Sequence, residues 1–481
     1  MGSVSRSWRR MAVWRLAWIA GVVSGCGGVS AERASMREEA VGGELVVVRG
    51  ASRASAARGP SERAAIRRAE VILAAGREVS LDQLLAFADR HSPALEAARS
   101  ERVRSRAERV AASPEVPDEP ELEVAAGPRL ATGGAGIEVE AGIAQRFEIG
   151  GERGRRLAAA RRQHAVTEAR IADARWIVHC EIHAGFHQAL VARERVALAR
   201  SVLAFQESLV HIVERRLAAG DASTFALRLA QAEVAQARQA VLVAEQELLA
   251  VRLALAEVSG WPPARPPMPA GHLDAPRDPP SLETLVATAY RRVPALRARR
   301  AAVRASAARV EVADRETWPR PVVGVTYRLE HDPGAGGEAT HVVMGAVGLP
   351  LPIFRRNRGE RARARAELSV AEAELSADER TLTARIARTR GQVVAAARRL
   401  RSYGDDILPR FAENLGLLGR AYELGEIDLL ELSIGRERFL RIQSDALDAH
   451  RDYLVALAAL EREVGVDLWH DDHGDHHAGG H

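Results

Sequence analysis

The sequence predicts a mostly helical protein that also carries a few membrane-spanning β-strands. Three observations predict this fold class. Only 4% of the 481 residues are aromatic while 27% are charged, and a chain dominated by Ala, Leu, Arg and Glu is typical of long helices and coiled coils. Two long segments of the chain repeat one another. Three short stretches alternate between apolar and polar residues, and a fourth does so less cleanly, as strands with two different faces do.

The basic net charge of +4 belongs to the first residues of the chain. Residues 1–25 contain four Arg and no acidic residue, and without them the chain has 64 basic and 64 acidic side chains. The chain has no Lys, so all of these basic residues are Arg. The charge therefore gives no support for a nucleic-acid partner.

Residues 1–25 predict a signal peptide, because a basic start precedes an apolar run over residues 16–23 that is shorter than the about 20 residues a spanning helix needs. Met11 is an alternative start. Small residues lead to Cys26, which resembles the lipobox Cys of bacterial lipoproteins, a site of lipidation with palmitate among the acyl groups. Gly27 follows in place of an Asp, which favours the outer membrane. The alternative is an ordinary secretory signal with an incidental Cys. Residues 26–79 are expected to be a tether.

A duplication organises the rest of the chain. Residues 81–85 match residues 282–286, and Gly220 matches Gly425. We therefore expect a first repeat over 80–279 and a second over 280–468, each with the order helix, β-hairpin, long helix, turn, helix.

The elements of the two repeats follow from periodicity and from Gly and Pro positions. In the first repeat we expect a hairpin at 120–147, a long helix at 152–219 and a helix at 222–259. In the second we expect a hairpin at 321–349, a long helix at 357–424 with a kink at Pro409, and a helix at 427–464. Apolar residues spaced by seven predict close helix packing. In the first repeat these are Leu227, Val234, Val241, Leu248 and Leu255.

The strands show one apolar and one polar face, and Val323, Val325, Tyr327 and Leu329 illustrate the alternation. Strands of about ten residues with this pattern are typical of transmembrane barrels. The alternative is the half-buried sheet of a soluble protein. Four strands cannot close a barrel by themselves, and open edges cannot face lipid. A barrel must therefore be shared between chains, and three chains would supply twelve strands.

The turn between the last two helices, residues 421–432 (AYELGEIDLLEL), and its first-repeat counterpart at 217–223 resemble the hairpin turns of the TolC-type outer-membrane efflux family. The resemblance covers about residues 80–468. It implies a homotrimer with a 12-stranded outer-membrane β-barrel continued by a periplasmic α-helical barrel. It also implies an exit duct, without enzymatic activity or cofactor, that works with a periplasmic adaptor protein and an inner-membrane pump of the RND type.

The tip turns supply the candidate docking residues for such an adaptor. Gly220 and Gly425 permit the positive φ that ends a helix, while Asp, Ser and Glu side chains cap the following helix. A purely capping role is the alternative. The predicted tip residues are Gly220, Asp221, Ser223, Gly425, Glu426 and Asp428. The resemblance also implies acidic residues near the tunnel entrance, for which Glu413 and Glu423 are the candidates.

Two groups of His are candidate metal ligands. His179, His183 and His187 recur every four residues on one helix face, where two imidazoles can share an ion; the alternative is a polar stripe. The tail at 469–481 is rich in His and Asp, and its alternative is a solubilising segment. Its histidines are His470, His473, His476, His477 and His481.

The tail and the second-repeat tip turn together favour the heavy-metal branch of the family. In this respect the chain resembles the outer-membrane components of cobalt–zinc–cadmium or copper–silver efflux. The alternatives are a drug-efflux or type I secretion duct of the same fold, or a lipid-anchored coiled-coil scaffold.

Overall fold

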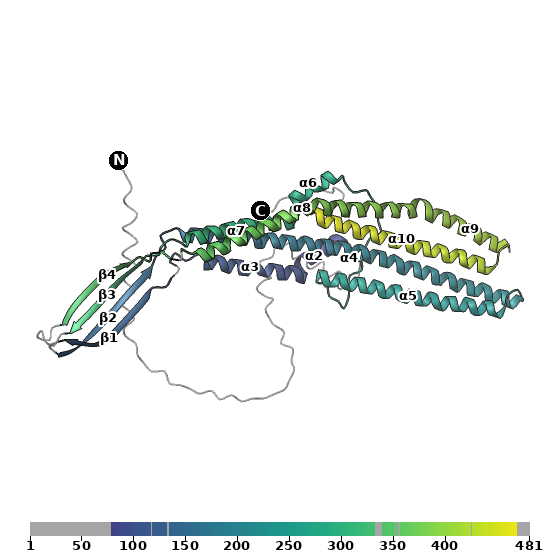
Figure 1. The fold of residues 1–481 in the computed structure, drawn as a ribbon. Helices are drawn as coiled ribbons and strands as arrows, with labels where there is room; N and C mark the ends of the chain where they lie inside the picture. Colours follow the sequence, from purple (N-terminus) through teal and green to yellow (C-terminus); the bar gives the residue numbers. More distant parts are fainter. Residues whose placement is uncertain are drawn as a thin grey trace, which may run out of the picture. The chain divides into compact units, whose positions relative to one another are not determined.

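The computed structural model describes residues 78–116, 118–131, 134–331, 339–351, 353–354, 356–424 and 426–468. All of them belong to one compact unit, Ser61–His481. The predicted signal peptide, the predicted lipidation residue Cys26, nearly all of the expected tether and the His-rich tail lie outside the described residues. Within the described unit, the four strands lie at one end and the tips of the helical hairpins lie at the other (Figure 1).

The first repeat begins with two short helices where the sequence predicted one. Helix α2 ends at His91, α3 begins at Pro93, and Ser92 between them is extended (φ −61°, ψ 124°). Proline has no backbone N–H to donate and pushes the preceding residue out of the helical region, so the helix must restart there. The elements of this repeat are α2 (Leu81–His91), α3 (Pro93–Ala111), β1 (Glu121–Ala131), β2 (Gly134–Arg146), α4 (Glu152–Ala219) and α5 (Thr224–Ser259).

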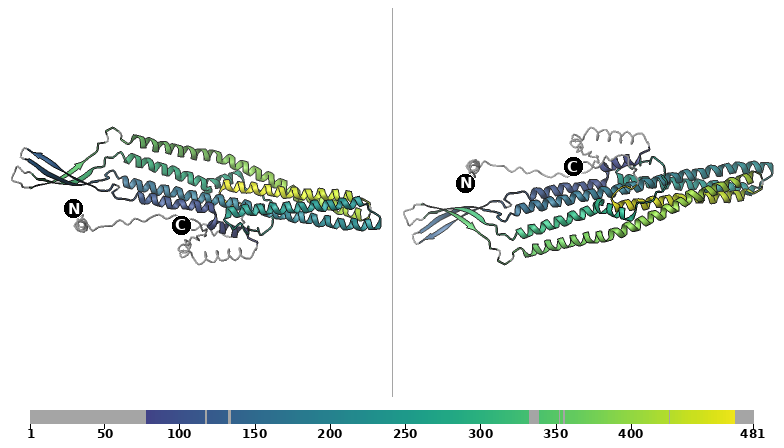
Figure 2. Two further views of the ribbon diagram at one scale, coloured as in Figure 1. Left: turned by 90° about the horizontal axis from the view of Figure 1, so that it is seen from below. Right: turned by 90° about the horizontal axis from the view of Figure 1, so that it is seen from above.

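The second repeat has the same order and the same Pro-induced break, here between Arg292 and Pro294. Its elements are α6 (Leu282–Arg292), α7 (Pro294–Arg315), β3 (Val322–His331), β4 (Ala339–Gly348), α8 (Arg358–Ser402), η3 (Tyr403–Ile407), α9 (Leu408–Leu424) and α10 (Leu429–Val464). Figure 2 shows the long helices lying along a common axis that extends away from the sheet.

The single long helix predicted over 357–424 is interrupted. A π-helical turn, η3, separates α8 from α9 and ends two residues before Pro409. Because Pro409 lacks the N–H that would bond to the carbonyl one turn earlier, the backbone adds one residue to that turn. The expected irregularity at Pro409 is therefore present, and it takes the form of a π-turn that ends one helix and begins another.

The sheet has four antiparallel strands in the order β1-β2-β3-β4. The pairing of β2 with β3 joins the hairpin of the first repeat to the hairpin of the second, for example Ile143 with Val325. The predicted mostly helical fold with two strand hairpins is confirmed.

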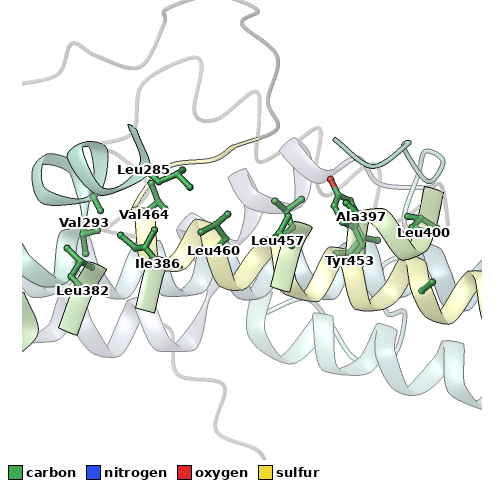
Figure 3. Packing of buried hydrophobic residues seen from close by; sticks show 14 of the residues in the cluster. Leu285, Val293, Leu382, Ile386, Ala397, Leu400, Tyr453, Leu457, Leu460 and Val464 are labelled. Atoms are coloured by element: carbon green, nitrogen blue, oxygen red, sulfur yellow. The ribbon is translucent and has the colours of Figure 1, made fainter. Parts of the chain in front are cut away.

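The largest hydrophobic cluster lies among α6, α8 and α10 of the second repeat (Figure 3). Ile386 of α8 and Leu460 of α10 are fully buried in it. The corresponding cluster of the first repeat surrounds Phe87, Phe186 and Trp261. Of the seam predicted along α5, Val234, Leu248 and Leu255 are buried, while Leu227 and Val241 are only partly buried.

Candidate functional site

The sheet has one apolar face, and its opposite face is polar over β1 to β3 but carries Val342 and Met344 on β4. The register pairs Leu122 with Ile143, Ile143 with Val325, and Val325 with Gly345, so the odd and even positions of all four strands stay on constant sides. Large apolar side chains on one face are exposed, namely Leu122, Val124, Ile137, Ile143, Val323, Val325, Tyr327, Val343 and Val347. An apolar patch of this extent is unusual on a soluble monomer, and it fits contact with lipid.

The opposite face is charged at its centre. Arg328 of β3 forms ion pairs with Glu138 (3.1 Å) and Glu140 (3.0 Å) of β2, and lies 3.8 Å from Glu330 of its own strand. One guanidinium thus bridges the two repeats and offsets the repulsion among three carboxylates. A polar face of this kind fits the water-filled interior of a barrel.

The edges of the sheet remain open in one chain. Among the described residues, β1 pairs only with β2, and β4 pairs only with β3. Unpaired backbone groups cost several kcal/mol each in hydrocarbon, so these edges need strands from other chains if the sheet enters a membrane.

The first tip turn joins α4 to α5. Gly220 has φ +83°, and the backbone N–H of Asp221 donates to the carbonyl oxygen of Arg216 over 2.8 Å. The Oγ atom of Ser223 accepts from the backbone N–H of Ala226 over 3.1 Å and caps α5. Gly220 therefore closes the first helix, and Ser223 opens the next.

The second tip turn repeats this arrangement. The N–H of Glu426 donates to the carbonyl oxygen of Ala421 over 2.9 Å, and Asp428 caps α10 by accepting from the N–H of Glu431 over 2.8 Å. Gly425 and the side chain of Glu423 lie outside what the structure describes. Glu413 is exposed on α9.

The capping prediction was partly wrong. Asp221 and Glu426 contribute backbone bonds to the helix ends, while the capping side chains belong to Ser223 and Asp428. The reason is geometric, since a capping side chain must stand directly before the first helical residue to reach the N–H three positions later. All four residues are exposed at the turns.

Apolar side chains also reach solvent at the tips. Phe225 is 75% exposed and Leu424 is 74% exposed. The two hairpins contact one another through Arg216 of α4, whose guanidinium carbon lies 4.6 Å from the centre of the Tyr422 ring on α9. The tips thus present solvent-facing apolar and acidic groups on a packed base, a surface suited to a protein partner.

A buried polar cluster connects α4 to the end of α10. His183 Nδ1 lies 2.9 Å from Glu461 Oε2, and the two side chains are only 6% and 1% exposed. The possible ligand atoms of His183, Glu461 and Asp467 all lie within 4.8 Å of one another. His179 Nε2 lies 3.9 Å from Asp467 Oδ2. Sequence reasoning identified the histidines and missed both acids, although Glu461 is a charged residue within the apolar line of Leu457, Leu460 and Val464.

The predicted trio of His179, His183 and His187 does not converge on one point. His187 Nδ1 contacts the backbone carbonyl oxygen of His183 over 2.8 Å, and the two rings meet edge to face. Burial lowers the pKa of His187 to about 4, with a further lowering by His183. For His183, burial lowers the pKa, while the neighbouring carboxylates of Glu461 and Asp467 raise it by more, so that it lies above its usual value. Burial also raises the pKa of the Cys180 thiol.

Comparison with known proteins relates this chain to outer-membrane efflux proteins in both sequence and fold. The family profile described as "Outer membrane efflux protein" matches residues 285–466. The cobalt-zinc-cadmium resistance protein CzcC of Cupriavidus metallidurans is 26% identical over 321 residues, which cover 66% of this chain and 75% of CzcC. The structure of CusC aligns with 80% of this chain and 92% of its own, with a TM-score of 0.63 and 14% identity. The outer membrane protein VceC from Vibrio cholerae aligns with 81% and 96%, with a TM-score of 0.62 and 18% identity.

The chain shares the fold of CusC and VceC. Residues 285–466 match the outer membrane efflux protein family, and the predicted resemblance to the TolC-type family is confirmed.

Proposed function

We propose that three copies of this chain form the exit duct of a tripartite efflux system in the outer membrane. The observation that carries the proposal is the two-faced sheet with two open edges. Its exposed apolar face fits lipid, and its Arg328-centred face fits a water-filled interior. Three chains with four strands each give twelve strands and leave no open edge.

The helical hairpins continue the duct into the periplasm in this proposal. The exposed tip residues around Gly220 and Asp428 dock a periplasmic adaptor protein, and the adaptor connects the duct to an inner-membrane pump of the RND type. The apolar tips at Phe225 and Leu424 support a protein partner at this end. The acidic Glu413 and Glu423 are proposed to lie near the tunnel entrance.

Heavy-metal cations are the proposed cargo. The similarity to a cobalt–zinc–cadmium resistance protein supports this choice, as does the His- and Asp-rich tail, whose five histidines can collect divalent ions loosely. Lipid on Cys26 is proposed to anchor the chain in the outer membrane beside its barrel.

A deletion strain tests the cargo. Loss of the gene is expected to lower tolerance to zinc, cadmium or cobalt, and restoring the gene is expected to restore tolerance. Unchanged tolerance to these metals and to copper and silver, combined with lost tolerance to organic drugs, would assign the same duct to drug efflux.

The oligomer is tested separately. The duct proposal requires a heat-modifiable trimer in outer-membrane fractions. A chain that is released in soluble form without detergent would contradict the duct and favour a scaffold.

A further inference from the structure

We propose that His183, Glu461 and Asp467 bind a divalent transition-metal ion such as Zn²⁺ between α4 and the end of α10. The proposal is independent of the cargo, because it concerns an ion held by the folded protein and not an ion in transit.

The spacing of the three side chains fits one ion. Their ligand atoms lie within 4.8 Å of one another. Nitrogen and oxygen ligands bind zinc at about 2.0–2.2 Å, so two ligands of a tetrahedral ion stand about 3.4 Å apart. Modest side-chain rotations close this difference. His179 stands beside the group, with Nε2 at 3.9 Å from Asp467 Oδ2, and is placed to act as a fourth ligand.

The surroundings of the buried Glu461 carboxylate also favour a bound cation. Its Oε1 atom accepts from the backbone N–H of Leu468 over 3.1 Å, which fixes the carboxylate. Its Oε2 atom is buried and faces His183 Nδ1 at 2.9 Å, without a well-formed hydrogen bond from any of the described residues. A buried carboxylate oxygen in this condition is costly, and a cation between it and the imidazole would satisfy both.

The ligand types select the ion. One or two imidazoles with two carboxylates form a borderline nitrogen and oxygen set, which suits Zn²⁺ or Co²⁺ better than a soft monovalent ion. The hydrogen bond from Leu468 to Glu461 acts as the outer-shell support that such sites have.

The three ligand residues come from both repeats of the chain. His183 belongs to the first repeat, whereas Glu461 is in the last turn of α10 and Asp467 follows Gly465, where that helix ends. A bound ion would fasten the end of the second repeat to the long helix of the first. Metal binding should therefore stabilise the fold.

The test uses the full-length, detergent-solubilised protein with the five tail histidines replaced by Gln, so that the tail does not contribute binding. After removal of metals with a chelator, zinc alone is added, and bound metal is measured by equilibrium dialysis and mass spectrometry. We expect about one ion per chain and a higher thermal midpoint with zinc. Cobalt in place of zinc should give visible absorption bands of a low-symmetry site.

His183→Gln and Asp467→Asn should each weaken zinc binding more than about tenfold, the loss that even outer-shell partners cause. His211→Gln is the matched control, because His211 is exposed on the same helix and lies 3.3 Å from the carboxylate of Glu214. Zinc binding by the His183→Gln variant equal to that of its parent would overturn the proposal, as would a parent that retains no zinc. If His183→Gln does not fold, Asp467→Asn is the deciding variant, because the Asp467 side chain is 20% exposed and its substitution disturbs the packing less.

Discussion

A β-carbon placed on Gly260 would lie only 2.0 Å from the backbone carbonyl oxygen of His91. Gly260 ends α5 with φ +75°, and His91 is the last residue of α2. The second repeat has the same arrangement, since a β-carbon on Gly465 would lie 2.7 Å from the Cα atom of Val293. In each repeat, therefore, the end of the last helix rests directly on the backbone at the break between the two short helices.

Gly260→Ala and Gly465→Ala should therefore destabilise the protein strongly, because the methyl group meets backbone that cannot rotate away. The left-handed φ alone costs about 1–3 kcal/mol for a residue with a β-carbon, and the clash adds to it. Gly220→Ala separates the two effects, since φ is +83° there and nothing lies within 4 Å. Thermal midpoints measured by circular dichroism should be clearly higher for Gly220→Ala than for the other two variants. Equal midpoints for the three would show that the close contact of Gly260 and Gly465 with neighbouring backbone is unimportant.

The capping residues at the tips should matter more than their acidic neighbours. Removing Ser223 or Asp428 as a cap by substitution with Ala should cost about 1 kcal/mol of local stability, since each accepts a bond from its helix. Hydrogen exchange at the first turns of α5 and α10 should become faster in these variants. Asp221→Ala and Glu426→Ala serve as controls and should leave these rates nearly unchanged; faster exchange in the controls as well would argue against this assignment of the caps.

The two faces of β1 should respond oppositely to charge. Val124→Arg places a cation on the exposed apolar face, where a charge at mid-membrane costs about 2–4 kcal/mol. Ala125→Arg places the same cation on the other face. Outer-membrane trimer levels, measured by unheated gel electrophoresis, should fall for Val124→Arg and stay near normal for Ala125→Arg. The reverse ranking would place water at the apolar face.

Lowering the pH should reduce the stability of the protein in part through His450 on α10. Burial lowers the pKa of His450 below its usual value, and a contact with Asp274 offsets this only in part. The unfolded chain then binds more protons than the folded one, so His450 contributes stability above pH about 6.5 that is lost as the pH falls through the unfolded pKa towards the folded one. Between neutral and mildly acidic pH, the thermal midpoint should fall less in the His450→Gln variant than in the parent protein. Parallel curves for the two proteins would contradict a lowered pKa.

Sequence patterns predicted the strands well, because the alternation of Val323, Val325, Tyr327 and Leu329 reports directly on the two environments of the sheet. They also located α4 and the turn after it, since Gly220 ends an uninterrupted helical pattern. The breaks before Pro93 and Pro294 were missed, although a Pro that starts a helix marks the end of the previous one.

The sequence indicated only the histidine of the buried cluster of His183, Glu461 and Asp467, and neither of its acids. His183 and Glu461 are far apart along the chain, and their approach depends on α4 packing against α10 across the two repeats. A helix periodicity reports which face is buried and not which helix covers it. The π-turn before Pro409 likewise depends on how the backbone absorbs a missing donor, for which the sequence indicates the place and not the form.

The open edges of β1 and β4 have a genetic consequence. In the proposed ring of three chains, one copy with a damaged edge disrupts the ring in which it sits, whatever the quality of its two neighbours. In a cell that makes normal and damaged copies equally, random assembly would leave about one ring in eight free of damaged copies. An allele that spoils a strand edge should therefore be dominant over the normal one, whereas an allele that prevents synthesis should be recessive.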